Sequence, residues 1–110
     1  MTTGSVPLHP FDALDDPGAK GLELADGRPI FLVRRGDAVH AYLNRCPHAR
    51  QRLDSWPDRF LTMAEDHILC GAHAALFRIE DGFCLSGPCA GKSLTSVPVE
   101  VSEGWVRLRE

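Results

Sequence analysis

Short apolar stretches that alternate with polar residues dominate the chain, and no stretch keeps a helical period for three turns. Residues 28–44, "RPIFLVRRGDAVHAYLN", predict a hairpin with a central Gly-Asp turn, and residues 96–110, "SVPVEVSEGWVRLRE", predict a second hairpin around Glu-Gly. Shorter strands are expected within residues 21–30 and 76–85, each around an Asp-Gly turn. This pattern predicts an all-β fold, a small antiparallel sandwich or barrel.

The middle of the chain departs from this pattern. Residues 44–63 carry loop signals, including two prolines, and a short strand, "HILC" at residues 67–70, follows them. We expect this part to form a subdomain of loops inserted into the β-framework. Residues 1–18 are expected to be a loosely attached N-terminal lead-in, and residues 19–110 a single domain.

Composition and charge exclude several classes of function. The chain has 110 residues, of which 44% are apolar, and its longest apolar runs span four residues, against roughly 20 for a membrane helix. Its net charge of −3 is too small to indicate nucleic acid or a membrane surface as a partner. There is no Gly-rich dinucleotide or phosphate loop. The first residues show no export signal, so a cytoplasmic location is expected.

Two Cys/His pairs carry the candidate chemistry. Cys46 and His48 flank a proline in "NRCPHARQ", and Cys70 and His73 stand in "LCGAHAAL". Four cysteines in a cytoplasmic domain indicate metal or redox chemistry before disulfides. Two thiolates and two imidazoles suit a structural zinc, a mononuclear iron or copper, or a [2Fe–2S] cluster with split ligation.

The spacing of the first pair favours two metal ions over one. Zinc modules usually hold their metal with ligands two to four residues apart, whereas only Pro47 separates Cys46 from His48. A stiff loop of this kind does not easily turn both side chains onto one tetrahedral ion. It suits ligands that reach two neighbouring metal ions.

These motifs resemble those of the Rieske iron–sulfur family. "CPH" followed by "CGAH", on loops ahead of a "GPC…L…VPV" stretch, is similar to the family's Cys-x-His and Cys-x-x-His pattern over roughly residues 22–108. The resemblance implies the Rieske fold and one [2Fe–2S] cluster per chain. It implies that Cys46 and Cys70 ligate the buried iron. It implies that His48 and His73 ligate the outer iron.

The chain also departs from the family pattern. Ala74 stands where glycine usually follows the second histidine, so the backbone there must avoid a positive φ. Gln51 and Ala72 occupy the positions of the disulfide that staples the cluster loops in high-potential members, so that staple cannot form. Cys84 and Cys89 flank "LSGP" and are expected to be structural thiols beside the cluster, with a local disulfide or ligation as alternatives.

The positions that follow the second histidine imply a low reduction potential. High-potential relatives carry a serine and a tyrosine two and four residues after that histidine, and both donate hydrogen bonds to sulfur. Ala75 and Phe77 occupy these positions here and donate none. Because such bonds stabilise the added electron, we expect a potential of about −150 mV.

The resemblance thus implies a Rieske-type ferredoxin, a one-electron carrier and not an enzyme by itself. It would be a monomer that takes electrons from a flavin reductase and passes them to a partner such as a Rieske-type oxygenase. Arg50 and Arg52, near the first loop, are expected to steer it toward an acidic partner. The alternatives are the small subunit of a nitrite-reductase-like complex, whose members often lack the ligands, a redox-sensing or scaffold domain, and a structural zinc-binding domain.

Overall fold

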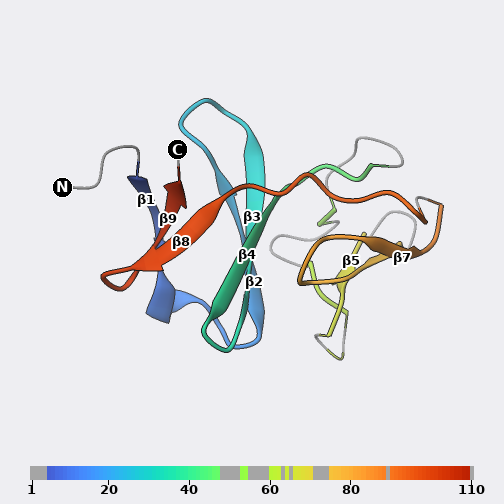
Figure 1. Ribbon diagram of the computed structural model, residues 1–110, viewed down its shortest axis with the longest axis horizontal. Helices are drawn as coiled ribbons and strands as arrows, with labels where there is room; N and C mark the ends of the chain where they lie inside the picture. Colours follow the sequence, from blue (N-terminus) through green and yellow to red (C-terminus); the bar gives the residue numbers. More distant parts are fainter. Residues whose placement is uncertain are drawn as a thin grey trace.

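Over the residues that it describes, the computed structural model contains three antiparallel sheets of three strands each (Figure 1). It describes residues 5–47, 53–54, 60–62, 64, 66–70, 75–88 and 90–109. Over these residues the helical structure amounts to one 3₁₀ turn, η1 (Phe11–Ala13). The predicted all-β class is confirmed. No helix in the described part of the chain is long and apolar enough to span a membrane.

The strands follow the predicted hairpins closely. The sheets are β1 (Ser5–Pro10), β9 (Trp105–Arg109) and β8 (Val99–Ser102); β2 (Gly18–Glu23), β3 (Pro29–Arg35) and β4 (Ala38–Leu43); and β5 (Ile68–Leu69), β6 (Leu76–Phe77) and β7 (Cys84–Ser86), each in that spatial order. The predicted β3–β4 and β8–β9 hairpins are both present. We call the first two sheets the framework, and the described residues from 44 to 94, with the third sheet, the lobe.

The N-terminal segment differs from the expected loose lead-in. Strand β1 pairs with β9 from Ser5 opposite Arg109 to Pro10 opposite Trp105, and Leu14, a few residues later, is buried. Residues 5–14 are therefore part of the framework. Two prolines hide the strand signal in the sequence, yet proline is tolerated here because β1 is an edge strand.

Strand β3 lies between two apolar cores. Ile30 and Leu32 belong to the core between the two framework sheets, together with Val106. Phe31 and Val33 belong to a second core that the framework shares with the lobe. All four β3 residues are fully buried. A strand covered on both faces has no need of polar alternation, which explains the uninterrupted "IFLV" run.

The second core joins the lobe to the framework through aromatic contacts and one buried hydrogen bond. The Phe31 ring stacks on Phe60 with centroids 4.4 Å apart, and tilts against Tyr42 at 5.7 Å. The Tyr42 hydroxyl donates a hydrogen bond to the carbonyl of Ile79 in the lobe. Burial raises the pKa of Tyr42, and the charge of Asp81 adds to this effect, so the hydroxyl remains a donor.

Candidate functional site

The first predicted cysteine ligand is buried because β4 leads directly into the second core. Strand β4 ends at Leu43, and Cys46 follows with 1% of its surface exposed, in the same apolar cluster as Phe31 and Phe60. Arg45 is exposed beside it. The end of the strand therefore turns the thiol inward and leaves the preceding cation in solvent.

Asn44 is a residue that the motif analysis missed. It is the one buried polar side chain among the described residues, with 2% exposure. Its Oδ1 accepts a hydrogen bond from the backbone N–H of Leu53 at 2.7 Å, and its Nδ2 donates to Oδ1 of Asp54 at 3.0 Å. The available sequence signal was an asparagine at the end of an apolar strand, two residues before Cys46.

The second predicted cysteine ligand follows β5. Cys70 is fully buried and lies in the same core as Cys46. Its N–H donates to the carbonyl of Ala75 at 2.9 Å, which ties together the two ends of the second Cys/His loop. Ala75 and Phe77 are fully buried too, so the side chains that follow this loop supply apolar surface and no hydrogen-bond donor.

A third segment, residues 86–88, packs against the end of the second loop. Gly87 has φ +104°, and a Cβ there would lie 2.7 Å from the Cα of Ala75. Only glycine permits both this backbone conformation and this approach. Cys84 is buried just before the segment, and its Sγ donates to the carbonyl of Ser86 at 3.3 Å.

The structure brings the two predicted cysteine ligands into one apolar core. The predicted histidine ligands and several other residues of the sequence analysis lie outside the described residues: His48, His73, Arg50, Gln51, Arg52, Ala72, Ala74 and Cys89. Because Cys89 is among them, the alternative of a Cys84–Cys89 disulfide also falls outside the described residues. Within the described part of the chain, no group of three or more His, Cys, Asp or Glu side chains is placed to hold a metal ion.

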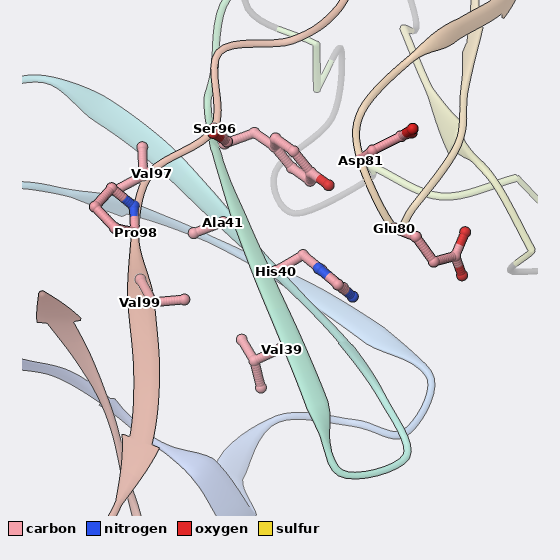
Figure 2. Close-up of a pocket in the computed structure, with 10 residues that line it drawn as sticks. Val39, His40, Ala41, Glu80, Asp81, Ser96, Val97, Pro98 and Val99 are labelled. Atoms are coloured by element: carbon pink, nitrogen blue, oxygen red, sulfur yellow. The ribbon is translucent and has the colours of Figure 1, made fainter.

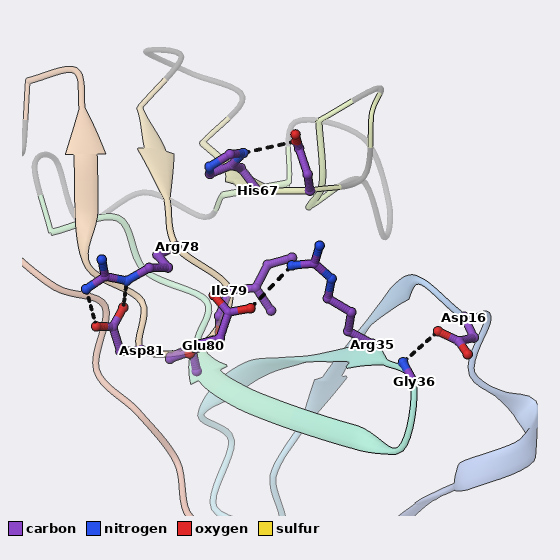
Figure 3. Close-up of polar contacts among 10 residues, drawn as sticks. Asp16, Arg35, Gly36, His67, Arg78, Ile79, Glu80 and Asp81 are labelled. Atoms are coloured by element: carbon purple, nitrogen blue, oxygen red, sulfur yellow. Dashed lines mark hydrogen bonds and ion pairs between the residues drawn. The ribbon is translucent and has the colours of Figure 1, made fainter.

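A groove of about 400 Å³ is lined by residues 39–42 of β4, by the lobe turn at Glu80 and Asp81, and by residues 96–99, which lead into β8. Figure 2 shows His40 on one side and the lobe turn with Glu80 and Asp81 on the other. Both carboxylates already have cationic partners: Arg35 binds Glu80 at 3.3 Å, and Arg78 binds Asp81 (Figure 3). The groove therefore lies where the framework meets the lobe, and the Arg35–Glu80 ion pair joins the two beside it.

The whole of this architecture matches a known domain. The sequence fits the Rieske [2Fe-2S] domain family over residues 6–101. The chain belongs to this family. Its cofactor is therefore a [2Fe–2S] cluster and not the structural zinc considered above. Two buried cysteines in one core fit such a group, because thiolates are the ligands that iron–sulfur clusters require. The match begins within β1, in agreement with that strand's place in the framework.

Solved structures show the same fold. The ferredoxin of carbazole 1,9a-dioxygenase from Nocardioides aromaticivorans IC177 matches with a TM-score of 0.79 and 24% identity, over 97% of this chain and 98% of that one. A chain in a complex of reduced oxygenase and oxidized ferredoxin of carbazole 1,9a-dioxygenase matches with a TM-score of 0.79 and 23% identity, over 98% and 94%. The terminal oxygenase from Novosphingobium sp. KA1 matches over 96% of this chain and 29% of its own, with a TM-score of 0.78 and 24% identity. No curated protein matches by sequence.

Proposed function

We propose that this Rieske domain is a ferredoxin-type carrier of single electrons. In the proposed site, Cys46 and Cys70 ligate one iron. His48 and His73 ligate the other. The observation that carries the proposal is the burial of Cys46 and Cys70 in one apolar core, at the ends of two loops that each contain one Cys and one His. A thiolate pair in such a core suits the inner iron, and the histidines of the same two sequence motifs would then bind the outer one.

The surroundings of the site support a low reduction potential. When bound, a [2Fe–2S] cluster takes up and releases one electron, and two imidazole ligands raise its potential above that of all-cysteine clusters. Ala75 and Phe77 exclude water beside the second loop without donating a hydrogen bond to sulfur. We therefore retain the expected potential of about −150 mV, at the low end of the Rieske range.

The proposed partners are a flavin reductase that supplies the electron and an oxygenase that accepts it. Two of the matched structures support the choice of an oxygenase, because one is a ferredoxin of a dioxygenase and another holds a ferredoxin together with its oxygenase. In this role the chain acts as one component of an oxygenase system and not as an enzyme by itself. Its monomeric state and cytoplasmic location, both expected from the sequence, belong to the same proposal.

Replacing one histidine ligand by cysteine tests the ligand set. In His48→Cys or His73→Cys the added thiolate charge should move the potential from about −150 mV toward the −400 mV of all-cysteine ferredoxins. His40→Cys, in the groove on β4, is the matched control and should leave the potential unchanged. Redox titration of the visible spectrum measures all three, with EPR of the reduced proteins. Equal potentials in all three variants would contradict the ligand assignment.

A charge reversal beside the first loop tests the partner. Arg50→Glu with Arg52→Glu should slow electron transfer to an oxygenase at low salt, because like charges oppose the encounter. The rates should converge at high salt, where the charges are screened. Arg28→Glu, on the exposed turn between β2 and β3, is the control. Stopped-flow reoxidation of the reduced protein measures the rate, and an unchanged rate at low salt would exclude steering by these arginines.

A further inference from the structure

The buried side chain of Asn44 spans the two ends of the first Cys/His loop. Leu53 and Asp54, its two partners, lie nine and ten residues further along the chain, beyond Cys46 and His48. Both polar atoms of its side-chain amide form hydrogen bonds, since the oxygen accepts from the backbone N–H of Leu53 and the nitrogen donates to the carboxylate of Asp54. These two hydrogen bonds hold residue 44 beside residues 53 and 54, as backbone hydrogen bonds hold neighbouring strands together elsewhere in the molecule.

The same residue is also held by the framework. The N–H of Asn44 donates to the carbonyl of Pro29 at 2.9 Å, at the start of β3. A continuous path of hydrogen bonds therefore runs from β3 through Asn44 to Leu53. Leu53 is fully buried and shares the second core with Cys46. The hydrogen bond to Asn44 therefore helps to hold Leu53 in the apolar core that contains the Cys46 thiol.

Loss of the hydrogen bonds of Asn44 would cost free energy. The hydrogen bond from Leu53 to Asn44 is buried, and an unsatisfied buried donor destabilises the state that contains it. The bond to Asp54 involves a charged acceptor, which strengthens it. Asn44 therefore discriminates between the closed loop and any arrangement in which residues 53 and 54 move away from residue 44.

We infer that Asn44 is a positioning residue that closes the first cluster loop and holds Cys46 in its place for iron. The inference rests on the proposed ligand role of Cys46. Asn44 touches no reacting atom in this assignment. It acts through Leu53 and Asp54, and its effect should appear as the rate at which the protein loses its cluster and as a changed EPR signal.

An exchange of the two side-chain types tests this inference in the cluster-loaded, full-length protein. Asn44→Asp keeps the acceptor for Leu53 but removes the donor and faces the carboxylate of Asp54. Asp54→Asn keeps an acceptor without the charge. The double variant Asn44→Asp/Asp54→Asn restores a full bridge, because the new amide at position 54 can donate to the new carboxylate at position 44.

Asn44→Asp should accelerate loss of the cluster to a chelator about tenfold, from the value of a charge-assisted hydrogen bond. The double variant should return within about twofold of the wild type, with its EPR signal and the amide exchange of Leu53 restored. An equal acceleration in the single and double variants would overturn the inference, as would a wild-type rate in Asn44→Asp. Faster exchange at Leu32 as well as Leu53 would likewise overturn it, since it would indicate general destabilisation.

A second variant covers the case in which Asn44→Asp does not fold. Asp54→Ala leaves the bond from Leu53 to Asn44 intact and should accelerate cluster loss about threefold; no acceleration would count against the bridge. The two proposals also fail separately. Amide exchange at Leu53 reports loop closure whatever ligates the iron, whereas the potential of His48→Cys reports ligation whatever closes the loop.

Discussion

The strand ladders of the framework are much longer than those of the lobe. Strands β2 and β3 pair over six residues, as do β3 and β4, whereas β5–β6 and β6–β7 pair over two residues each. Ladders of two residues do not support a sheet by themselves. The lobe is held instead by the core around Cys46 and Cys70 and by buried side-chain hydrogen bonds of Tyr42 and Asn44. In the proposed site, the cofactor would add to these contacts.

This difference shows how a small domain can hold a metal cluster. The framework has its own core and its own hydrogen bonds, so we expect it to remain folded when the site is perturbed. In the proposed site, loop residues of the lobe would ligate the iron atoms, and metal–ligand bonds would contribute folding energy where backbone pairing is sparse. We expect the framework to hold the lobe in position, and the bound cluster to stabilise the lobe.

Removal of the cluster should separate the two regions most clearly. After chelation of the iron from the full-length protein, amides at residues 68–70 and 75–77 should exchange at nearly the rate of an unfolded chain. Amides at residues 30–34 should stay protected, because the framework core does not involve the cluster. Hydrogen exchange with mass spectrometry measures both regions. A simultaneous loss of protection in both would show that the framework also depends on the cofactor.

Truncation of neighbouring β3 residues should affect the two cores differently. Phe31→Ala and Leu32→Ala each remove a fully buried side chain and should lower the free energy of unfolding by about 2–5 kcal/mol. Only Phe31 faces the lobe, where it stacks on Phe60, so only Phe31→Ala should also accelerate cluster loss. Urea unfolding and chelator-driven bleaching measure the two effects. If Leu32→Ala bleached equally fast, the cores would not be independent.

A pair of glycines should separate close packing from backbone strain. Gly87→Ala introduces a Cβ 2.7 Å from the Ala75 backbone, whereas nothing lies within 4 Å of a Cβ at Gly91, and both have positive φ. Both variants should lose about 1–2 kcal/mol of stability for the φ angle. Gly87→Ala should lose about 1–3 kcal/mol more from the close contact and should bleach faster. Equal urea midpoints would mean that the segment can move away from Ala75.

The turn at residues 80–82 should give the smallest effect, with a defined pH dependence. Hydrogen bonds from Arg78, drawn in Figure 3, and from the N–H of Phe83 lower the pKa of Asp81 from 3.8 to about 2. Since the folded-state pKa is the lower one, this stabilisation is complete above pH 3.8 and disappears as the pH falls toward 2. Asp81→Asn should therefore unfold slightly earlier than the wild type in urea, by the same margin at pH 7 and pH 5.

That margin should shrink at pH 3, where the wild-type carboxylate begins to take up its proton. The Asp81 side chain is half exposed, so solvent screening keeps the effect small. A margin that grew between pH 5 and pH 3 would contradict the assigned direction of the pKa shift.

Local sequence patterns were sufficient for most of the framework. The β3–β4 and β8–β9 hairpins follow from alternating apolar residues around turns that contain glycine, and each strand pairs with its neighbour in sequence. Strand β1 could not be predicted in this way. Its two prolines argue against a strand, and its partner β9 lies at the opposite end of the chain. Pairing of distant segments is decided by the assembled core and not by any local period.

The sequence by itself determined the family and the ligand set that we propose. Cys46-x-His48 and Cys70-x-x-His73 predict a soft, mixed ligand set, because ligand type and spacing are local properties of the chain. Only the tertiary structure decided that Cys46 and Cys70 share one core, that Asn44 bonds Leu53 and Asp54, and that Gly87 meets Ala75. These contacts arise when distant segments pack together to bury apolar surface and satisfy buried polar groups, and short-range sequence patterns do not encode which partners they choose.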